Sequence, residues 1–248
     1  NTDRKSLVKI MENVKAISAG GNHSLILTSD NILWATGRNS SGQLGDGTFT
    51  DRKSPVKIME NVKAISAGAV HSLILKNDNS LWATGRNLSG QLGDGTNTNR
   101  KSPVKIMENV KAISADGDHN LIVTTDNTLW ATGENLYGQL GDGTNTNRNS
   151  PVKIMENVKA ISAGGVHSLI LTTDNMLWAT GYNSSGQLGD GTNTNRNSPV
   201  KIMENVKAIS AGGEHSLILK IDNSLWASGD NSFGQLGDGS FQDRDLYV

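Results

Sequence analysis

Five histidines occupy the same position in five similar segments of the chain: His23, His71, His119, His167 and His215, each 48 residues after the last. Histidine binds metals and transfers protons near neutral pH, so this pattern could serve either chemistry. A metal site needs several ring nitrogens within about 2.1 Å of one ion, and catalysis needs a base within about 3 Å of a nucleophile. Equivalent positions in successive repeats hold the histidines apart unless all point into one channel. The pattern therefore favours a repeated packing role, with ring nitrogens bonded to nearby backbone carbonyls.

The histidines belong to a repeat that covers the whole chain. The sequence SPVKIMENVKAISAG recurs almost unchanged, and a 48-residue unit fits five times, at residues 9–56, 57–104, 105–152, 153–200 and 201–248. Such a period predicts one supersecondary unit per repeat, stacked against its neighbours within one domain. The first and last eight residues, NTDRKSLV and FQDRDLYV, fall in the same phase of the repeat. This predicts that residues 1–10 supply the outer strand that closes a ring; the alternative is a part of a longer array.

Within one unit, short apolar runs alternate with turn signals, which is typical of strands. In the second unit the expected strands are residues 61–68, 71–75, 80–85 and 103–107. The dipeptide Asp78-Asn79 predicts a tight two-residue hairpin turn, because both residue types tolerate positive φ. Pro103 at the start of the fourth strand predicts an edge position, where a missing N–H does no harm. Four antiparallel strands per unit, arranged radially, describe an all-β protein: a β-propeller of five four-stranded antiparallel blades closed by the N-terminal strand.

Other recurring motifs are expected to be structural. The tryptophans Trp34, Trp82, Trp130, Trp178 and Trp226 could stack a ligand, but their place in the third strand favours filling the space between blades. The segment GQLGDG, as at residues 90–95, lacks the lysine and helix of a phosphate loop and favours a turn with positive φ at glycine. The segment DGTNTN, as at residues 94–99, lacks the closing acidic residue of a helix–loop–helix calcium site. We therefore expect no metal, no cofactor and no catalytic residues.

The motifs AGGNHSLIL, LWATGRN and GQLGDGT together resemble the repeat of the regulator of chromosome condensation family, in all five units. The resemblance implies a β-propeller with one four-stranded blade per repeat, and a function in protein binding. Seven-bladed relatives include a guanine-nucleotide exchange factor and bacterial inhibitors of β-lactamase, both of which act through a propeller surface. This chain has five units, and Trp34 lies three residues before Gly37 instead of directly before it. Neither of those two activities is carried over.

Composition narrows the range of partners. The chain has 23 basic and 24 acidic residues, for a net charge of −1, and no cysteine. This balance gives no long-range attraction for nucleic acid or an anionic membrane. The absence of cysteine excludes disulfides, thiol nucleophiles and thiolate metal sites. No apolar run approaches the roughly 18 residues that a membrane helix needs. We expect neither nucleic acid nor a membrane as a partner, and a closed ring predicts a monomer.

Function is best sought where the five copies differ. The copies vary in the turn between the first and second strands, just after the third strand, and in the hairpin between the second and third strands. An antiparallel meander brings the first two zones to one face, which we call the variable face. Its candidate partner-binding residues are Arg38, Arg86, Leu88, Asp116, Asp118, Glu134, Tyr137, Tyr182, Glu214, Asp230 and Phe233. Arginines on the first two blades and acidic residues on the third and fifth predict that one side of this face is positively charged and the other negatively charged.

These residues predict a noncatalytic protein-binding scaffold. Loops on a rigid frame commonly carry binding specificity, and tyrosine and arginine are favoured anchors at protein interfaces. One alternative is a propeller that binds a small ligand or a glycan at the mouth of its channel. Another is a structural or engineered array of repeats without a dedicated partner. An enzyme is the least favoured class, because catalysis usually requires one asymmetric group of residues and not five copies.

Overall fold

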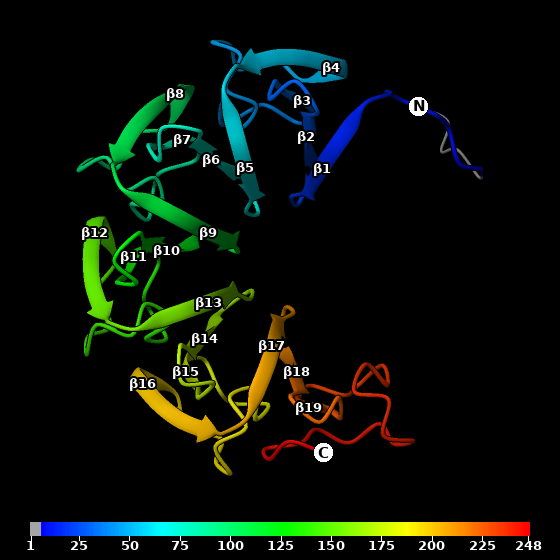
Figure 1. Ribbon diagram of the computed structural model, residues 1–248, viewed down its shortest axis with the longest axis vertical. Coiled ribbons are helices and arrows are strands. Elements are labelled where there is room, and N and C mark those ends of the chain that lie inside the picture. The colour runs from blue at the N-terminus through cyan, green and yellow to red at the C-terminus, as the bar shows by residue number, and fades with distance from the viewer. Residues whose placement is uncertain (1–5) are drawn as a thin grey trace.

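Each repeat folds into one antiparallel sheet. The computed structural model describes residues 6–248, and its five sheets, here called blades 1 to 5, form an open arc around a central space (Figure 1). Blade 1 contains β1 (Val14–Ala19), β2 (His23–Thr28), β3 (Leu33–Gly37) and β4 (Arg52–Met59). Blade 2 contains β5 (Val62–Ala67), β6 (His71–Lys76), β7 (Leu81–Gly85) and β8 (Arg100–Met107). Blade 3 contains β9 (Val110–Asp116), β10 (His119–Thr124), β11 (Leu129–Gly133) and β12 (Arg148–Met155).

The last two blades continue the pattern. Blade 4 contains β13 (Val158–Ala163), β14 (His167–Thr172), β15 (Leu177–Gly181) and β16 (Arg196–Met203). Blade 5 has three strands, β17 (Val206–Ala211), β18 (His215–Lys220) and β19 (Leu225–Gly229). Within each blade the strands pair in chain order, with the first strand nearest the centre of the arc (Figure 1). Residues 6–248 contain no helix that is long and apolar enough to span a membrane.

The expected strands are confirmed, with two differences in detail. The outer strand β8 begins at Arg100 and not at Pro103, because a register shift after Ala83 allows Gly85 to pair with Arg100. In the hairpin between β6 and β7 only Asn79 has positive φ, at 66°. The Asp78 carboxylate accepts hydrogen bonds from the backbone N–H and the hydroxyl of Ser80 in this turn. Asparagine tolerates the left-handed region better than most residues, which explains its place in all five hairpins.

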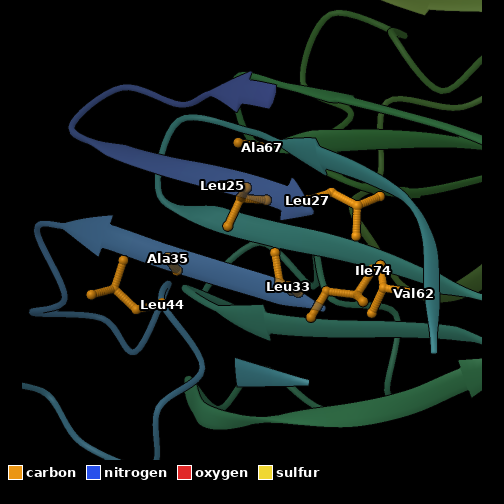
Figure 2. Packing of buried hydrophobic residues seen from close by; sticks show 8 residues of the cluster. All are labelled: Leu25, Leu27, Leu33, Ala35, Leu44, Val62, Ala67 and Ile74. Atoms are coloured by element: carbon orange, nitrogen blue, oxygen red, sulfur yellow. The ribbon is translucent and has the colours of Figure 1, made fainter. Parts of the chain in front are cut away.

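The core lies between blades and not within them. Figure 2 shows Leu25, Leu27 and Leu33 of blade 1 packed against Val62, Ala67 and Ile74 of blade 2. The same positions form the next three interfaces between blades. One face of each sheet therefore supplies a row of leucines, and the other face supplies valine and isoleucine. Trp82, Trp130, Trp178 and Trp226 pack against these clusters while partly buried, which confirms that they fill space between blades.

The two ends of the arc leave these faces uncovered. Leu33, Leu81, Leu129 and Leu177 are 0% exposed, whereas Leu225, the same residue in blade 5, is 66% exposed. At the other end, Val62, Val110, Val158 and Val206 are 0% exposed, and the corresponding Val14 is 38% exposed. Identical sequence is thus buried or exposed according to whether a neighbouring blade is present.

The expected closure by the N-terminal strand is wrong for the residues that the structure describes. Residues 1–5 lie outside the described range, and Ser6–Met11 joins no sheet. The position beside β19 is taken by the chain's own C-terminal segment, Arg244–Val248. Gly229 pairs with Arg244, and Ala227 exchanges two backbone hydrogen bonds of 2.9 Å with Val248. The two ends of the chain are in the same phase of the repeat, so either could fill this position. The C-terminal segment is directly connected to blade 5, and it fills the position while the arc stays open (Figure 1).

Four of the histidines join one blade to the next. His23 Nε2 lies 2.9 Å from Ser72 Oγ of blade 2, and the Ser72 hydroxyl donates to the carbonyl of Gln43. With its proton committed to that carbonyl, Ser72 accepts from His23, which places the imidazole proton on Nε2. The same contact joins His71 to Asn120, His119 to Ser168 and His167 to Ser216. The packing interpretation is confirmed, although the partner is a side chain of the next blade and not a backbone carbonyl.

Burial keeps these imidazoles neutral. It lowers the pKa of His23 to about 4, helped by the nearby His71, and lowers the pKa of His119 and His167 to about 3. Burial also lowers the pKa of His71. Among residues 6–248, no three or more histidine, aspartate or glutamate side chains are grouped closely enough to hold a metal ion.

We predict that one leucine substitution will have opposite consequences in two blades. Leu129→Ala should lower the free energy of unfolding by roughly 2 to 5 kcal/mol, because the residue is 0% exposed and its loss leaves a cavity. Leu225→Ala should change the free energy by less than about 0.5 kcal/mol, because that side chain is mostly in solvent. Urea unfolding of both variants in dilute solution measures the difference. Equal losses would show that blade 5 has a covered face.

We also predict a loss of stability in mild acid. Histidines of the unfolded chain titrate near 6.5, whereas burial in the folded protein lowers the pKa of His23 to about 4 and those of His119 and His167 to about 3, so the unfolded chain binds more protons between these values. Stability should be full above about pH 6.5 and should fall as the pH is lowered, by about 2 kcal/mol at pH 5 for each of these three histidines. Urea midpoints at pH 7 and pH 5 measure this loss. In the His119→Gln variant the loss of stability at pH 5 should be smaller by about 2 kcal/mol. A urea midpoint that does not change between pH 7 and pH 5 would contradict the lowered pKa of these histidines.

Candidate functional site

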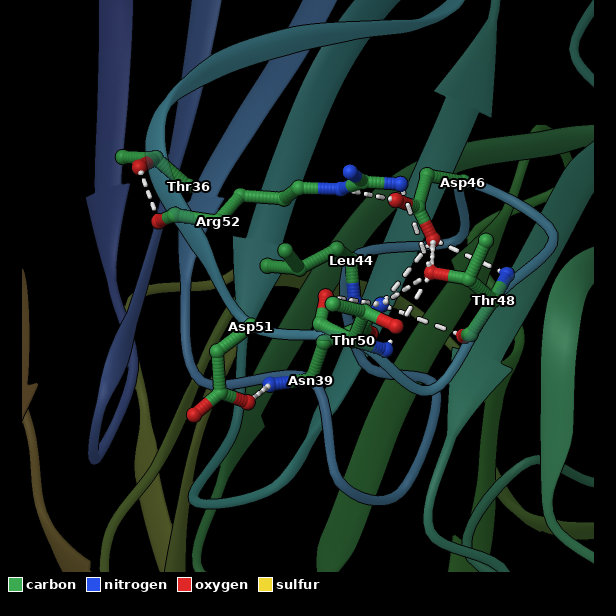
Figure 3. A network of polar contacts seen from close by, with 8 residues as sticks. All are labelled: Thr36, Asn39, Leu44, Asp46, Thr48, Thr50, Asp51 and Arg52. Carbon is green, nitrogen blue, oxygen red and sulfur yellow. Dashed lines mark hydrogen bonds and ion pairs between the residues drawn. The ribbon is translucent and has the colours of Figure 1, made fainter.

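A buried asparagine organises the long loop that follows the third strand of each blade. In blade 1, Asn39 is fully buried, and its Nδ2 donates to Asp46 Oδ1 at 2.9 Å and to the carbonyl of Thr48 at 3.1 Å (Figure 3). Its Oδ1 accepts from the backbone N–H of Leu44 at 3.0 Å, and its own N–H donates to Asp51 at 2.7 Å. Asn87, Asn135 and Asn183 repeat this network. The loop is therefore held in shape by its own buried polar groups.

An arginine pairs with the aspartate of this loop. Arg52 Nε lies 2.6 Å from Asp46 Oδ2 (Figure 3), and the equivalent pair recurs in the other blades. Burial alone would raise the pKa of the Asp46 carboxyl, but hydrogen bonds from Thr48 and Arg52 outweigh it and hold the pKa below its ordinary value. The glycines of the GQLGDG segment have the expected positive φ, for example 78° at Gly45 and 81° at Gly47. The structural interpretation of this segment is confirmed.

The first two variable zones lie against each other in every blade. The residue after the third strand donates its backbone N–H to the turn between the first two strands: Arg38 to Asn22 at 2.8 Å, Arg86 to Val70 at 3.0 Å and Glu134 to Asp118 at 2.9 Å. Tyr182 and Asp230 make the equivalent bonds in blades 4 and 5. The hairpin between the second and third strands is at the opposite end of the strands. The variable face therefore consists of neighbouring loops on a constant frame.

The structure brings some of the candidate residues together across the boundary of blades 2 and 3. Arg86 Nη1 lies 3.3 Å from Asp118 Oδ2, and Gln91 Nε2 donates to Asp118 Oδ1 at 2.7 Å. Burial, and then the charge of Asp118, raise the pKa of Glu134. This cluster neutralises Arg86, so the expected division of the face into a positive and a negative half does not hold at blade 2.

Aromatic residues meet across the next boundary. The rings of Tyr137 in blade 3 and Tyr182 in blade 4 have centroids 4.8 Å apart and an interplanar angle of 59°. Leu88 and Leu136, at equivalent positions of blades 2 and 3, are exposed, as is Tyr137. We call these four side chains, which belong to the loops after the third strands of three successive blades, the apolar strip.

The remaining candidates lie elsewhere. Arg38 is exposed on blade 1, and among the described residues its side chain donates to Ser40. Asp116 is half-buried and accepts from the backbone N–H of Gly117, and burial raises its pKa. Glu214, Asp230 and Phe233 lie on blade 5, where Phe233 is 89% exposed and Asp230 accepts from Ser232 and Gln235.

The sequence alone did not identify Gln91 as a residue that contacts the variable face. Gln91 belongs to the constant GQLG segment, so its invariance between units indicated a purely structural role. Its amide nevertheless reaches the variable Asp118 of the next blade, and Gln139 and Gln235 likewise reach the variable acids Glu134 and Asp230 of their own blades. The only available signal was that acidic residues occur at these positions in blades 3 and 5.

Comparisons with known proteins agree with this architecture. The family model of the RCC1-like domain matches residues 2–247. Human WBSCR16 is 26% identical to this chain with a TM-score of 0.84, and the match covers 95% of this chain and 66% of that protein. Prp20p from Saccharomyces cerevisiae is 23% identical with a TM-score of 0.83, and the match covers 95% of this chain and 64% of that protein. The chain thus spans just under two thirds of the length of these relatives.

A comparison with curated protein sequences gave no significant match. The family match over nearly the whole length agrees with the repeated four-stranded blades, the shared arc of sheets and the recurring GQLGDG loop. The chain belongs to the RCC1-like domain family.

Proposed function

We propose that the chain is a noncatalytic scaffold that binds another protein through its variable face. The observation that carries this proposal is the apolar strip formed by Leu88, Leu136, Tyr137 and Tyr182. Tyr137 and Tyr182 are in contact, and Leu88 and Leu136 are exposed on the loops of successive blades; exposed aromatic and apolar side chains of this kind are typical of interaction sites. Tyrosine is a favoured anchor because it buries a large area while losing little conformational freedom.

The frame beneath the strip supports this role. Asn87 and Asn135 are fully buried and fix the loops that carry Leu88 and Leu136. A loop already ordered in the free protein loses less entropy when it binds, which improves affinity. Other units carry different residues at these positions. Serine stands at the position of Leu88 and Leu136 in the first, fourth and fifth units, and at the position of Tyr137 in the first, second and fourth. Arg38 is the counterpart of Tyr182 in the first unit. The blade architecture therefore does not require them.

The polar cluster beside the strip would add specificity. Asp118 is already paired with Arg86 and Gln91, so a partner needs no strong charge to meet it. Glu134 is half-buried, feels the charge of Asp118, and accepts a hydrogen bond from Gln139. We expect the partner to present an apolar patch with a hydrogen-bond donor or a basic residue at its rim.

The relatives point to the same class of function. One structure shows Kap60 bound to the yeast protein Prp20. A second structure, of Prp20p from Saccharomyces cerevisiae, was described together with its binding to Gsp1p and histones. At 23% identity this likeness shows the fold alone, so the proposed class of partner rests on the loops of the present chain.

The test replaces the strip with residues that the repeat itself uses. In the triple variant Leu88→Ser, Leu136→Ser and Tyr137→Ser, each position takes the serine found in other units, so the melting temperature should stay within a few degrees. The parent and the variant are each immobilised, and the proteins that they capture are compared by quantitative mass spectrometry. Affinity for the captured partner should fall roughly a thousandfold, since two anchors typically contribute about 2 kcal/mol each.

A matched control changes the opposite face. Lys76→Ser, Asn77→Ser and Ile221→Ser lie in hairpins between second and third strands and should leave capture unchanged. Capture that survives the triple variant, or that is lost in the control, would overturn the proposed surface. Binding of glycans instead of proteins at Tyr137 would assign the face to a different ligand class.

A further inference from the structure

A glutamine in the long loop of each blade holds its side-chain amide in one orientation. These glutamines are Gln43, Gln91, Gln139, Gln187 and Gln235. In each of them Oε1 accepts from the backbone N–H two residues earlier, as Gln43 does from Ser41 at 2.9 Å. Because only the oxygen of an amide side chain accepts a hydrogen bond, this contact fixes which end is Nε2. The donor end of every one of these amides therefore needs an acceptor elsewhere.

In three blades that acceptor is a carboxylate of the variable face. Gln91 Nε2 donates to Asp118 of the next blade at 2.7 Å. Gln139 donates to Glu134, and Gln235 donates to Asp230, each within its own blade. The acceptor thus stands either 27 residues after the glutamine or 5 residues before it.

In blade 1 neither of these two positions carries an acceptor. Arg38 stands before Gln43 and Val70 stands after it, and neither side chain can accept a proton. Gln43 is fully buried, and its Nε2 has no hydrogen-bond acceptor within residues 6–248. A buried donor that stays unpaired destabilises a protein, because it has lost its water without gaining a partner.

Blade 4 resembles blade 1 only in part. Gln187 Nε2 also lacks an acceptor in the part of the chain that the structure describes. Glu214, however, stands at the position of Asp118 and is exposed, so rotation of its side chain supplies a carboxylate from within the protein. Blade 1 has no such residue at either position.

Blade 2 shows what the residues of blade 1 are able to hold. Arg86 and Gln91 grip the carboxylate of Asp118 between them: Gln91 Nε2 binds Oδ1, and Arg86 Nη1 lies 3.3 Å from Oδ2. Arg38 and Gln43 are the same two residue types at the same two positions, one unit earlier. Blade 1 therefore has both donors of this contact and, with Val70 in place of the aspartate, lacks its carboxylate.

We infer that Arg38 and Gln43 form a binding site for a carboxylate, which an aspartate or glutamate side chain of a partner protein supplies. One carboxylate oxygen accepts from Gln43 Nε2, and the other accepts from the guanidinium of Arg38. Arg38 is exposed and donates to Ser40 Oγ at 2.8 Å, so it turns from a neutral acceptor to a charged and stronger one. The source of the carboxylate rests on the proposed protein-binding function, whereas the site itself does not.

The test uses small probes, so that no partner protein is needed. Nitrogen–proton correlation NMR spectra follow the side-chain amide resonance of Gln43 during titration with acetate, with N-acetylaspartate methylamide and with the neutral N-acetylasparagine methylamide. Both carboxylates should shift the resonance to saturation with a dissociation constant on the order of 10 mM, since two charge-assisted hydrogen bonds act at a partly exposed site. The neutral probe should bind at least about tenfold more weakly.

Two variants assign the binding to these residues. Val70→Asp supplies the missing carboxylate from within the chain, and blades 3 and 5 already carry acidic residues at this position. It should abolish binding of both probes and move the Gln43 amide resonance toward that of Gln91. Arg38→Gln removes the charged donor and should weaken binding about tenfold.

Lys53→Gln is the matched control. It also removes one positive charge from blade 1, but from an exposed position on the outer strand β4. This variant should bind the carboxylate probes as the parent does, whereas a general attraction of anions to blade 1 would be reduced by it. Melting temperatures of all variants show whether each is folded.

Several results would overturn the site: no saturable shift with either carboxylate, an equal shift with the neutral probe, or undiminished binding to Val70→Asp. Binding of acetate without binding of the aspartate probe would overturn the assignment to a protein side chain. All of these variants retain Leu88, Leu136 and Tyr137, and the probes test the site without a partner. Failure of the carboxylate site is therefore distinguishable from failure of the apolar strip.

Discussion

Each blade of this protein is apolar on both faces, and the remaining structure depends on this constraint. Ile26 and Leu27 are neighbours on one strand, so their side chains point to opposite faces, and both are almost fully buried. A single four-stranded sheet cannot cover two apolar faces, so stability comes from contacts between neighbouring blades, as in other repeat proteins. The buried histidines follow from this arrangement. Each lies at an interface, where a neutral imidazole can hydrogen-bond to the next blade and a charged one would lose its hydration.

The same constraint explains the division between constant and variable positions. Residues that meet a neighbouring blade are copied from unit to unit, and so are the buried asparagine and the Asp–Arg pair that hold the long loop. These networks satisfy their own polar groups, which leaves the outermost loop residues free to change. Tyr137 and Leu136 could replace serine because nothing beneath them depends on the side chain. A surface for binding can therefore differ between blades without any change in the frame.

Much of the fold could be predicted from the sequence, because period, turn residues and apolar runs all repeat five times. The strands, the positive φ of the loop glycines and the neighbouring position of the two variable zones follow from local pattern. Three features do not. The choice between Ser6–Ile10 and Arg244–Val248 as the outer strand of blade 5 depends on spatial closure, since both segments are in the same phase. The bond from His71 to Asn120 depends on which residues meet across blades. The contact of Gln91 with Asp118 joins a constant residue to a variable one, and comparison of the units cannot reveal such a pair.

Repetition has a further physical consequence, because residues of the same type meet different neighbours. Leu129 is 0% exposed between blades 3 and 4, whereas Leu225, its counterpart in blade 5, is 66% exposed. The residue type is the same, so burial at this position is decided by the blade that packs against it. Positions on the faces of the sheets therefore carry nearly the same residues in every blade, while the loop residues Glu134, Tyr182 and Asp230 differ. Substitutions in the loops leave the contacts between blades unchanged, and the two surfaces can change independently.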